Sequence, residues 1–368
     1  MASRDHISNF LIRIWIFFSV LGVFLTEHIF ILPMPVLIGW PIIFLNWNHT
    51  KKRFPFLKSW SFMVIIVLLL HAFSEWKESV VSLITFLTAI GVIHLYIGDD
   101  IRRFNLVVKM IIFTLVLSTL VLIIGQINPA LNLQIRSIIL DNASFRTNNV
   151  TGLTTEVFHF GYQASALSGI TIAYIIYQKH LKNRLLIYIL FFISLLAILW
   201  GMQRAVFFSV FLYLLFIIRE GRIRYIIYFM AFIVFLWSLG LFDQLLTGNT
   251  IFWKILLSNS DEIGLGRFFI QVETVQLLFQ HPFGIWVKGL NLDQIMSNHP
   301  GYLGYFNISP HNAYLVYMLE MGIPFILIIG YILFSTFKAI INVIHLKDFS
   351  KIDILSKVVA FALVGLLS

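Results

Sequence analysis

NLVVKMIIFTLVLSTLVLIIGQI, residues 105–127, is the stretch of sequence that decides the fold. Lys109 is its only charged residue, and the run is long enough for a helix to cross a hydrocarbon core of about 30 Å. Backbone polar groups must pair within such a segment in lipid, so the run must be helical. The whole chain shares this character, because 59% of its 368 residues are hydrophobic and 12% are charged. We therefore predict an all-α fold, a polytopic transmembrane bundle.

Further apolar runs of similar length bring the predicted total to about 11 helices. They lie near residues 10–26, 29–47, 57–73, 79–97, 157–177, 185–202, 203–218, 225–242, 312–337 and 353–368. The last run ends with the chain at Ser368 and has about the minimum spanning length, so we expect a further C-terminal helix or tail beyond it.

The basic residues predict which side of the membrane each loop faces. With a cytoplasmic N-terminus, alternate loops place 19 of the 26 Lys and Arg residues inside. The others are Lys77, Arg136, Arg146, Arg204, Lys254, Arg267 and Lys288. Cytoplasmic loops carry an excess of Lys and Arg, so this alternation supports the orientation.

Two external segments are too long to be turns, and we expect binding or chemistry there. Residues 1–242 are predicted to form transmembrane helices with a short external loop near 128–156, residues 243–311 a large extracytoplasmic loop, and residues 312–368 the C-terminal helices. Within the large loop, residues 265–280 have the pattern of an amphipathic helix, which would lie on the membrane surface.

The composition also narrows the function classes. The chain has no cysteine, which excludes disulfides and thiolate chemistry, and the external segments lack a cluster of His and carboxylates at ligand spacing. We therefore predict no metal and no cofactor. The net charge of +9 follows from the topology and predicts no nucleic-acid partner. A flippase or transporter, an alternative class, would concentrate polar residues near the bilayer midplane, where these runs have few.

Three residues are candidates on chemical grounds. His311 lies where the longest polar stretch re-enters an apolar run, and an imidazole can take a proton from a hydroxyl near neutral pH. Arg204 lies between two apolar runs, and Arg267 opens the surface helix, where the helix dipole disfavours a cation. Guanidinium groups bind phosphate oxygens in a bidentate fork. Helix capping by His311 and headgroup contacts by the arginines are the alternatives.

Several motifs resemble those of the O-antigen ligase and polysaccharide polymerase superfamily. In order, they are Gly264-Leu265-Gly266-Arg267, His281-Pro282-Phe283-Gly284, Pro310-His311-Asn312-Ala313-Tyr314-Leu315 and Glu320-Met321-Gly322-Ile323-Pro324. Gln203-Arg204-Ala205 is similar to the family's Ser-Arg-Gly-Ala turn, with Gln in place of Ser and without the Gly. Arg146 with Thr151-Gly152-Leu153-Thr154-Thr155-Glu156 is similar to a pattern of the polymerases, which favours a polymerase over a ligase. The resemblance covers roughly residues 140–335.

The resemblance implies a GT-C-like membrane glycosyltransferase at the outer face of the bacterial plasma membrane. The donor would be an undecaprenyl-diphosphate-linked oligosaccharide, and the acceptor a lipid-linked repeat unit or, in a ligase, lipid A core. A chain-length regulator is a further partner to expect.

The arginines could stabilise the departing diphosphate without a metal, and His311 could activate the acceptor hydroxyl, with Glu156 as its rival. The expected substrate-binding residues are Arg146, Arg136, Asn312, Tyr314, Trp286 and Tyr302, although aromatic residues are also enriched at membrane interfaces.

Overall fold

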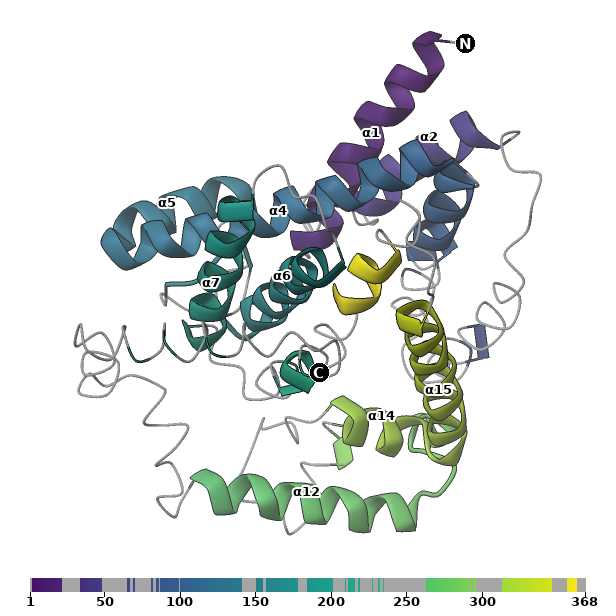
Figure 1. The fold of residues 1–368 in the computed structure, drawn as a ribbon. Coiled ribbons are helices and arrows are strands. Elements are labelled where there is room, and N and C mark those ends of the chain that lie inside the picture. The colour runs from purple at the N-terminus through teal and green to yellow at the C-terminus, as the bar shows by residue number, and fades with distance from the viewer. Residues whose placement is uncertain are drawn as a thin grey trace. The chain divides into compact units, whose positions relative to one another are not determined.

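The part of the chain that the computed structural model describes is mostly helical and contains no strand (Figure 1). The structure describes residues 2–21, 34–47, 87–98, 100–140, 150–154, 157–177, 184–200, 211–215, 263–290, 313–345 and 356–362, with single residues or pairs between 65 and 85, between 209 and 234 and between 292 and 295. The predicted all-α class is thereby confirmed.

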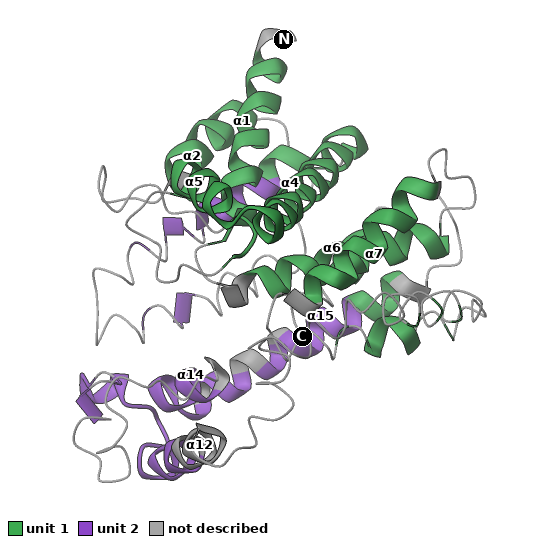
Figure 2. Cartoon of the chain, turned by 90° about the vertical axis from the view of Figure 1, so that its left-hand side faces the viewer, with its two compact units in different colours: residues 1–50, 95–255, 340–368 green, residues 51–94, 256–339 purple. Residues whose placement is uncertain are grey.

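Contacts within the chain divide it into two compact units (Figure 2). Unit 1 comprises residues 1–50, 95–255 and 340–368, and unit 2 comprises residues 51–94 and 256–339. The predicted segments 1–242, 243–311 and 312–368 concern the two sides of a membrane and remain a prediction.

The main helices of unit 1 follow from long apolar runs. They are α1 (Ala2–Leu21), α2 (Met34–Asn46), α4 (Ile101–Ile127), α5 (Pro129–Leu140), α6 (Val157–Tyr177) and α7 (Arg184–Trp200). Asn128 separates α4 from α5, because its N–H donates to Ile124 O at 2.7 Å while its Oδ1 accepts from Leu131 N–H at 3.1 Å. Pro129 then fills the first position of α5, where no backbone hydrogen bond is lost.

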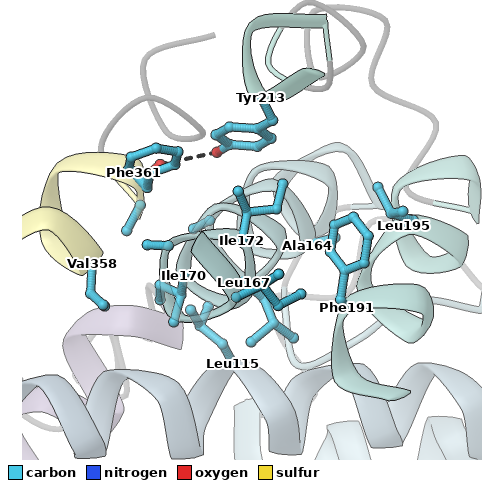
Figure 3. Packing of buried hydrophobic residues seen from close by; sticks show 14 of the residues in the cluster. Leu115, Ala164, Leu167, Ile170, Ile172, Phe191, Leu195, Tyr213, Val358 and Phe361 are labelled. Atoms are coloured by element: carbon cyan, nitrogen blue, oxygen red, sulfur yellow. Dashed lines mark hydrogen bonds between the residues drawn. The ribbon is translucent and has the colours of Figure 1, made fainter. Parts of the chain in front are cut away.

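Helix α6 lies at the centre of the unit 1 core (Figure 3). Its residues Ala164, Leu167 and Ile170 are buried between α4, α7 and residues 356–362. Tyr213 Oη donates to the backbone oxygen of Phe361 at 3.0 Å, and the two rings stack with centroids 6.1 Å apart. A helix that is buried on nearly every side belongs in the interior of a large bundle.

Polar side chains join α1, α2 and α4 at one end of unit 1. Arg103 Nη2 donates to Asp5 Oδ1 on α1 at 2.8 Å, and Arg103 Nη1 donates to Asn46 Oδ1 on α2 at 2.8 Å. Asn46 Nδ2 in turn donates to Ser8 Oγ at 2.7 Å. The beginnings of α1 and α4 therefore meet the end of α2, and these are the helix ends that the charge pattern predicts to be cytoplasmic.

The main elements of unit 2 are α12 (Ile263–Gln280), the short 3-10 helix η2 (Trp286–Lys288), α14 (Ala313–Met321) and most of α15 (Ile323–His345). Helices α12 and α14 lie side by side in both views (Figures 1 and 2). Their shared core consists of Leu277, Ile285, Trp286, Leu319, Met321 and Phe325.

The predicted runs and the observed helices agree at most places that the structure describes. Helix α6 covers residues 157–177, and α12 covers the predicted surface helix at 265–280. Two expectations were wrong in detail. The segment 128–156, predicted as a loop, contains α5, and the predicted span 312–337 divides at Gly322 into α14 and α15. Among the described helices, only α4 has the length and hydropathy of a membrane span, so the number of spans remains a prediction.

Candidate functional site

The predicted site residues fall into three groups. Two have described side chains, Arg136 on α5 and Trp286 in η2. Two others lie on described helices while their side chains lie outside the described part, Arg267 on α12 and Tyr314 on α14. The remaining positions lie outside the described residues, namely His311, Arg204, Glu156, Arg146, Asn312 and Tyr302.

Two of the sequence motifs meet in unit 2. The turn after α12 contains His281-Pro282-Phe283-Gly284, and the Glu320-Met321-Gly322-Ile323-Pro324 motif joins α14 to α15. The N–H of Ile285 donates to Leu319 O at 3.0 Å, and the N–H of Ile323 donates to Pro282 O at 2.8 Å. One hydrogen bond runs in each direction, so the two segments, residues 281–285 and 319–323, form what we call the paired turns.

Glycine is required on both sides of the paired turns. Gly284 has φ +87° and Gly322 has φ +67°, in the region that other residues adopt only with strain. A Cβ on Gly284 would lie 2.3 Å from the backbone oxygen of Glu320, and a Cβ on Gly322 would lie 2.3 Å from that of Pro282. The atoms in the way belong to backbone that hydrogen bonds hold in place, so neither segment can move aside cheaply.

The paired turns fix the end of α12 to the end of α14. Arg267 belongs to the first turns of α12, and His311 and Asn312 directly precede Ala313, the first residue of α14. The two helices that carry or follow the predicted donor and acceptor residues are therefore packed together. Where these side chains point remains a prediction.

Trp286 supports this arrangement from inside. Its side chain is 5% exposed and packs in the core that α12, α14 and η2 share. In this structure the indole therefore has a packing role, and its contact with a sugar remains a prediction. Large aromatic side chains contribute much of the buried area in such small clusters.

His281 and Lys288 form a basic pair beside the paired turns. Lys288 Nζ lies 3.1 Å from His281 Nδ1. Burial, and secondly the positive charge of Lys288, lower the pKa of His281 below its ordinary value. The neutral imidazole can then accept a hydrogen bond from the ammonium group. The His-Pro motif pointed to His281 in the sequence. The contact between His281 and Lys288 could not be predicted, because it depends on the turn that brings these two residues together.

In unit 1, Arg136 lies on the buried face of α5. Its side chain is 0% exposed, and its Nη2 donates to the backbone oxygen of Thr154 at 3.1 Å. Burial lowers the pKa of the guanidinium to about 10, so the group still carries its charge at neutral pH. Through this hydrogen bond Arg136 can hold the segment that precedes α6. Direct contact of Arg136 with a substrate remains a prediction.

The same segment, Thr151–Thr154, is held by side chains of α5 and α4. Asn132 Nδ2 on α5 donates at 2.8 Å to the backbone oxygen of Thr151, and at 2.8 Å to a backbone oxygen of α4. Ser118 Oγ on α4 accepts from the N–H of Leu153 at 2.8 Å and donates to Gln163 Oε1 on α6 at 2.6 Å. The sequence motif drew attention to residues 151–156, whereas nothing local in the sequence pointed to Asn132, Ser118 or Gln163.

Within the described part of the chain, no three His, Cys, Asp or Glu residues gather as a metal site would require. The cation, amides and hydroxyl described above, Arg136, Asn132, Gln163 and Ser118, bond to other protein atoms. Metal-free chemistry itself remains a prediction.

A comparison with protein-family models matches residues 189–330 to the family described as O-antigen ligase. The matched region contains α12, the paired turns, α14 and the positions Arg204, Arg267 and His311. No curated protein and no solved structure matches the chain. Over residues 189–330 the chain is therefore similar to O-antigen ligases, and this similarity supports an assignment to the superfamily of O-antigen ligases and polysaccharide polymerases.

Proposed function

We propose that this protein is a polymerase of a bacterial surface polysaccharide, such as an O-antigen, a capsule or an exopolysaccharide. It transfers glycan from an undecaprenyl-diphosphate carrier to a lipid-linked repeat unit at the outer face of the plasma membrane. The coarser activity, that of the O-antigen ligase and polymerase superfamily, follows from the family match. The carrier, the acceptor and the side of the membrane are the parts that we propose.

The paired turns are the observation that supports the proposal most. They join two family motifs that a long stretch of chain separates, and both lie inside residues 189–330. As a result α12, which carries Arg267, packs beside α14, which His311 directly precedes. A reaction between a diphosphate donor and a hydroxyl acceptor needs groups of these two kinds on neighbouring elements.

In the proposed reaction, the bond between the anomeric carbon of the donor and the carrier diphosphate breaks. The diphosphate leaves with the electron pair, and Arg267 and Arg204 stabilise its developing charge through charge-assisted hydrogen bonds. An acceptor hydroxyl forms the new bond to the anomeric carbon and passes its proton to His311, or to Glu156 if that residue is the base. Neither step calls for a cofactor.

The segment before α6 favours a polymerase over a ligase. Thr151–Thr154 belongs to the polymerase-like motif that ends at Glu156, and Asn132, Arg136 and Ser118 hold its backbone. The alternative is an O-antigen ligase, which would use the same donor and transfer the glycan to lipid A core. A flippase or transporter of lipid-linked glycans is a less favoured alternative.

Chain extension in membranes tests the proposal. Membranes that contain the full protein receive a lipid-linked repeat unit, and product length is read on a gel. We expect Arg267→Lys and His311→Ala to stop extension, because lysine lacks the bidentate fork and alanine cannot accept a proton. Lys254→Ala, another predicted external cation, is the matched control and should extend chains at the parent rate.

Three outcomes would overturn parts of this proposal. Extension at the parent rate by Arg267→Ala removes that residue from the site. Loss of parent activity in EDTA contradicts a metal-free reaction. Transfer of preformed glycan to added lipid A core, without extension of the repeat unit, identifies a ligase instead.

A further inference from the structure

Helix α5 buries its two most polar contacts, Asn132 and Arg136, while large apolar side chains of the same helix are exposed. The buried face carries Asn132, Arg136 and Leu140, at intervals of four residues. The outer face exposes Leu131 and Ile138, which are 41% and 82% exposed, together with the uncharged Gln134 between them. Surface helices of soluble proteins turn their apolar side chains inward and their charges outward.

The inner face is fixed by specific contacts, so this orientation is a built feature of unit 1. Arg136 is the only charged residue of α5, and it points inward to Thr154. Asn132 points inward as well, with both amide hydrogens donated to backbone oxygens at 2.8 Å. Turning α5 around to expose its polar side would break all of these hydrogen bonds.

Exposed apolar side chains also lie on α4, the helix that precedes α5 in the chain. Along α4, exposed apolar side chains recur every seven residues, at Phe113, Leu120 and Ile127, and thus lie on one face. Among the described helices, α4 is the one long and apolar enough to cross a membrane. Ile127 is 82% exposed and is followed in the chain, just beyond Asn128, by Leu131 and Ile138.

From the buried Arg136 and Asn132, the exposed Leu131 and Ile138 and the membrane-length α4 before them, we propose that α5 lies in the outer leaflet of the membrane, with Leu131 and Ile138 against lipid acyl chains. Lipid is the environment in which a helix buries its polar groups against protein and exposes its apolar ones. The inference rests on the membrane location within the proposed function, but not on the reaction. It sets the Thr151–Thr154 segment at the depth of the lipid headgroups, where the diphosphate of a lipid-linked substrate also lies.

Fluorescence quenching in vesicles tests this placement, because the native chain has no cysteine to replace. Single cysteines at Ile138 and Leu131 each carry an environment-sensitive fluorophore in the full-length protein. The protein is reconstituted in vesicles of phosphatidylethanolamine and phosphatidylglycerol. Phe113→Cys on α4 serves as the lipid-facing control, and Lys288→Cys, an exposed position of unit 2, serves as the water-facing control.

We expect doxyl-labelled phospholipid to quench the labels at Ile138 and Leu131 several-fold more than the label at Lys288, and iodide to show the opposite order. Iodide quenching at Ile138 equal to that at Lys288 would overturn the inference. Protection from both quenchers would also overturn it, because protein would then cover α5. If Phe113 too escapes the lipid quencher, the membrane location fails with it, whereas quenching at Phe113 alone overturns only the placement of α5.

Discussion

Replacing Gly284 by alanine should weaken the paired turns strongly. A left-handed φ costs an L-residue about 1–2 kcal/mol, and forcing a methyl group into packed atoms costs about 1–3 kcal/mol. The new Cβ would meet backbone, the Glu320 oxygen at 2.3 Å, so we expect a loss of about 2–5 kcal/mol in the stability of unit 2.

Gly289 supplies the matched control. Its φ is +69°, yet no heavy atom lies within 4 Å of an added Cβ. Gly289→Ala therefore bears the conformational cost alone, about 1–2 kcal/mol. Thermal unfolding of the two purified variants in detergent, followed by tryptophan fluorescence and by protease cleavage within residues 256–339, gives the difference. Equal loss in both variants would refute the reasoning, because the close approach would then cost nothing.

Three further predictions concern the described contacts. Arg103→Ala should lower the free energy of unfolding by about 1–3 kcal/mol, because Asn46 Oδ1 then loses the donor Arg103 Nη1. Arg102 is exposed, so Arg102→Ala should change stability little. Equal losses in the two variants would contradict this role of Arg103. His281 has a lowered pKa, so its neutral form favours folding; stability should be full above the ordinary pKa of 6.5 and fall as pH drops below it. His281→Gln should flatten that slope in melts from acid to neutral pH, and an unchanged slope would exclude His281 as its source. Arg136→Ala should lower the free energy of unfolding by about 2–4 kcal/mol, because it leaves a cavity and removes the donor to Thr154 O. Arg136→Met fills much of that cavity and should recover part of the loss. A methionine variant less stable than the alanine variant in thermal melts would contradict this explanation.

Local patterns in the sequence predicted the helices well. Apolar length alone predicted α6, and the run between Gly264 and Pro282 predicted α12. Helix α5 was missed although Asn128-Pro129 is a recognisable start, a capping side chain followed by proline at the first helical position. The length of the segment 128–156 favoured a loop and outweighed that signal.

The long-range contacts of the candidate site could not be predicted in the same way. In the sequence, Gly284 and Gly322 belong to separate motifs. Each glycine leaves room for the backbone of the other segment, and this requirement arises only because the two turns pack together in the fold. Likewise, Arg136 has the sequence appearance of an external cation, whereas its burial depends on how α5 packs against residues 151–154. Pairing of this kind is decided by the whole fold.

The paired turns also restrict how this region can be exchanged with that of a relative. A hybrid chain whose crossover lies between Gly284 and Gly322 would combine two halves that were never fitted to each other. Both halves must have glycine at these two positions, because a Cβ on either glycine would lie 2.3 Å from a backbone oxygen of the other segment. Crossovers placed before α12 or inside α15 keep both halves from one parent. Substrate preferences are therefore best transplanted as a single block from α12 to the start of α15.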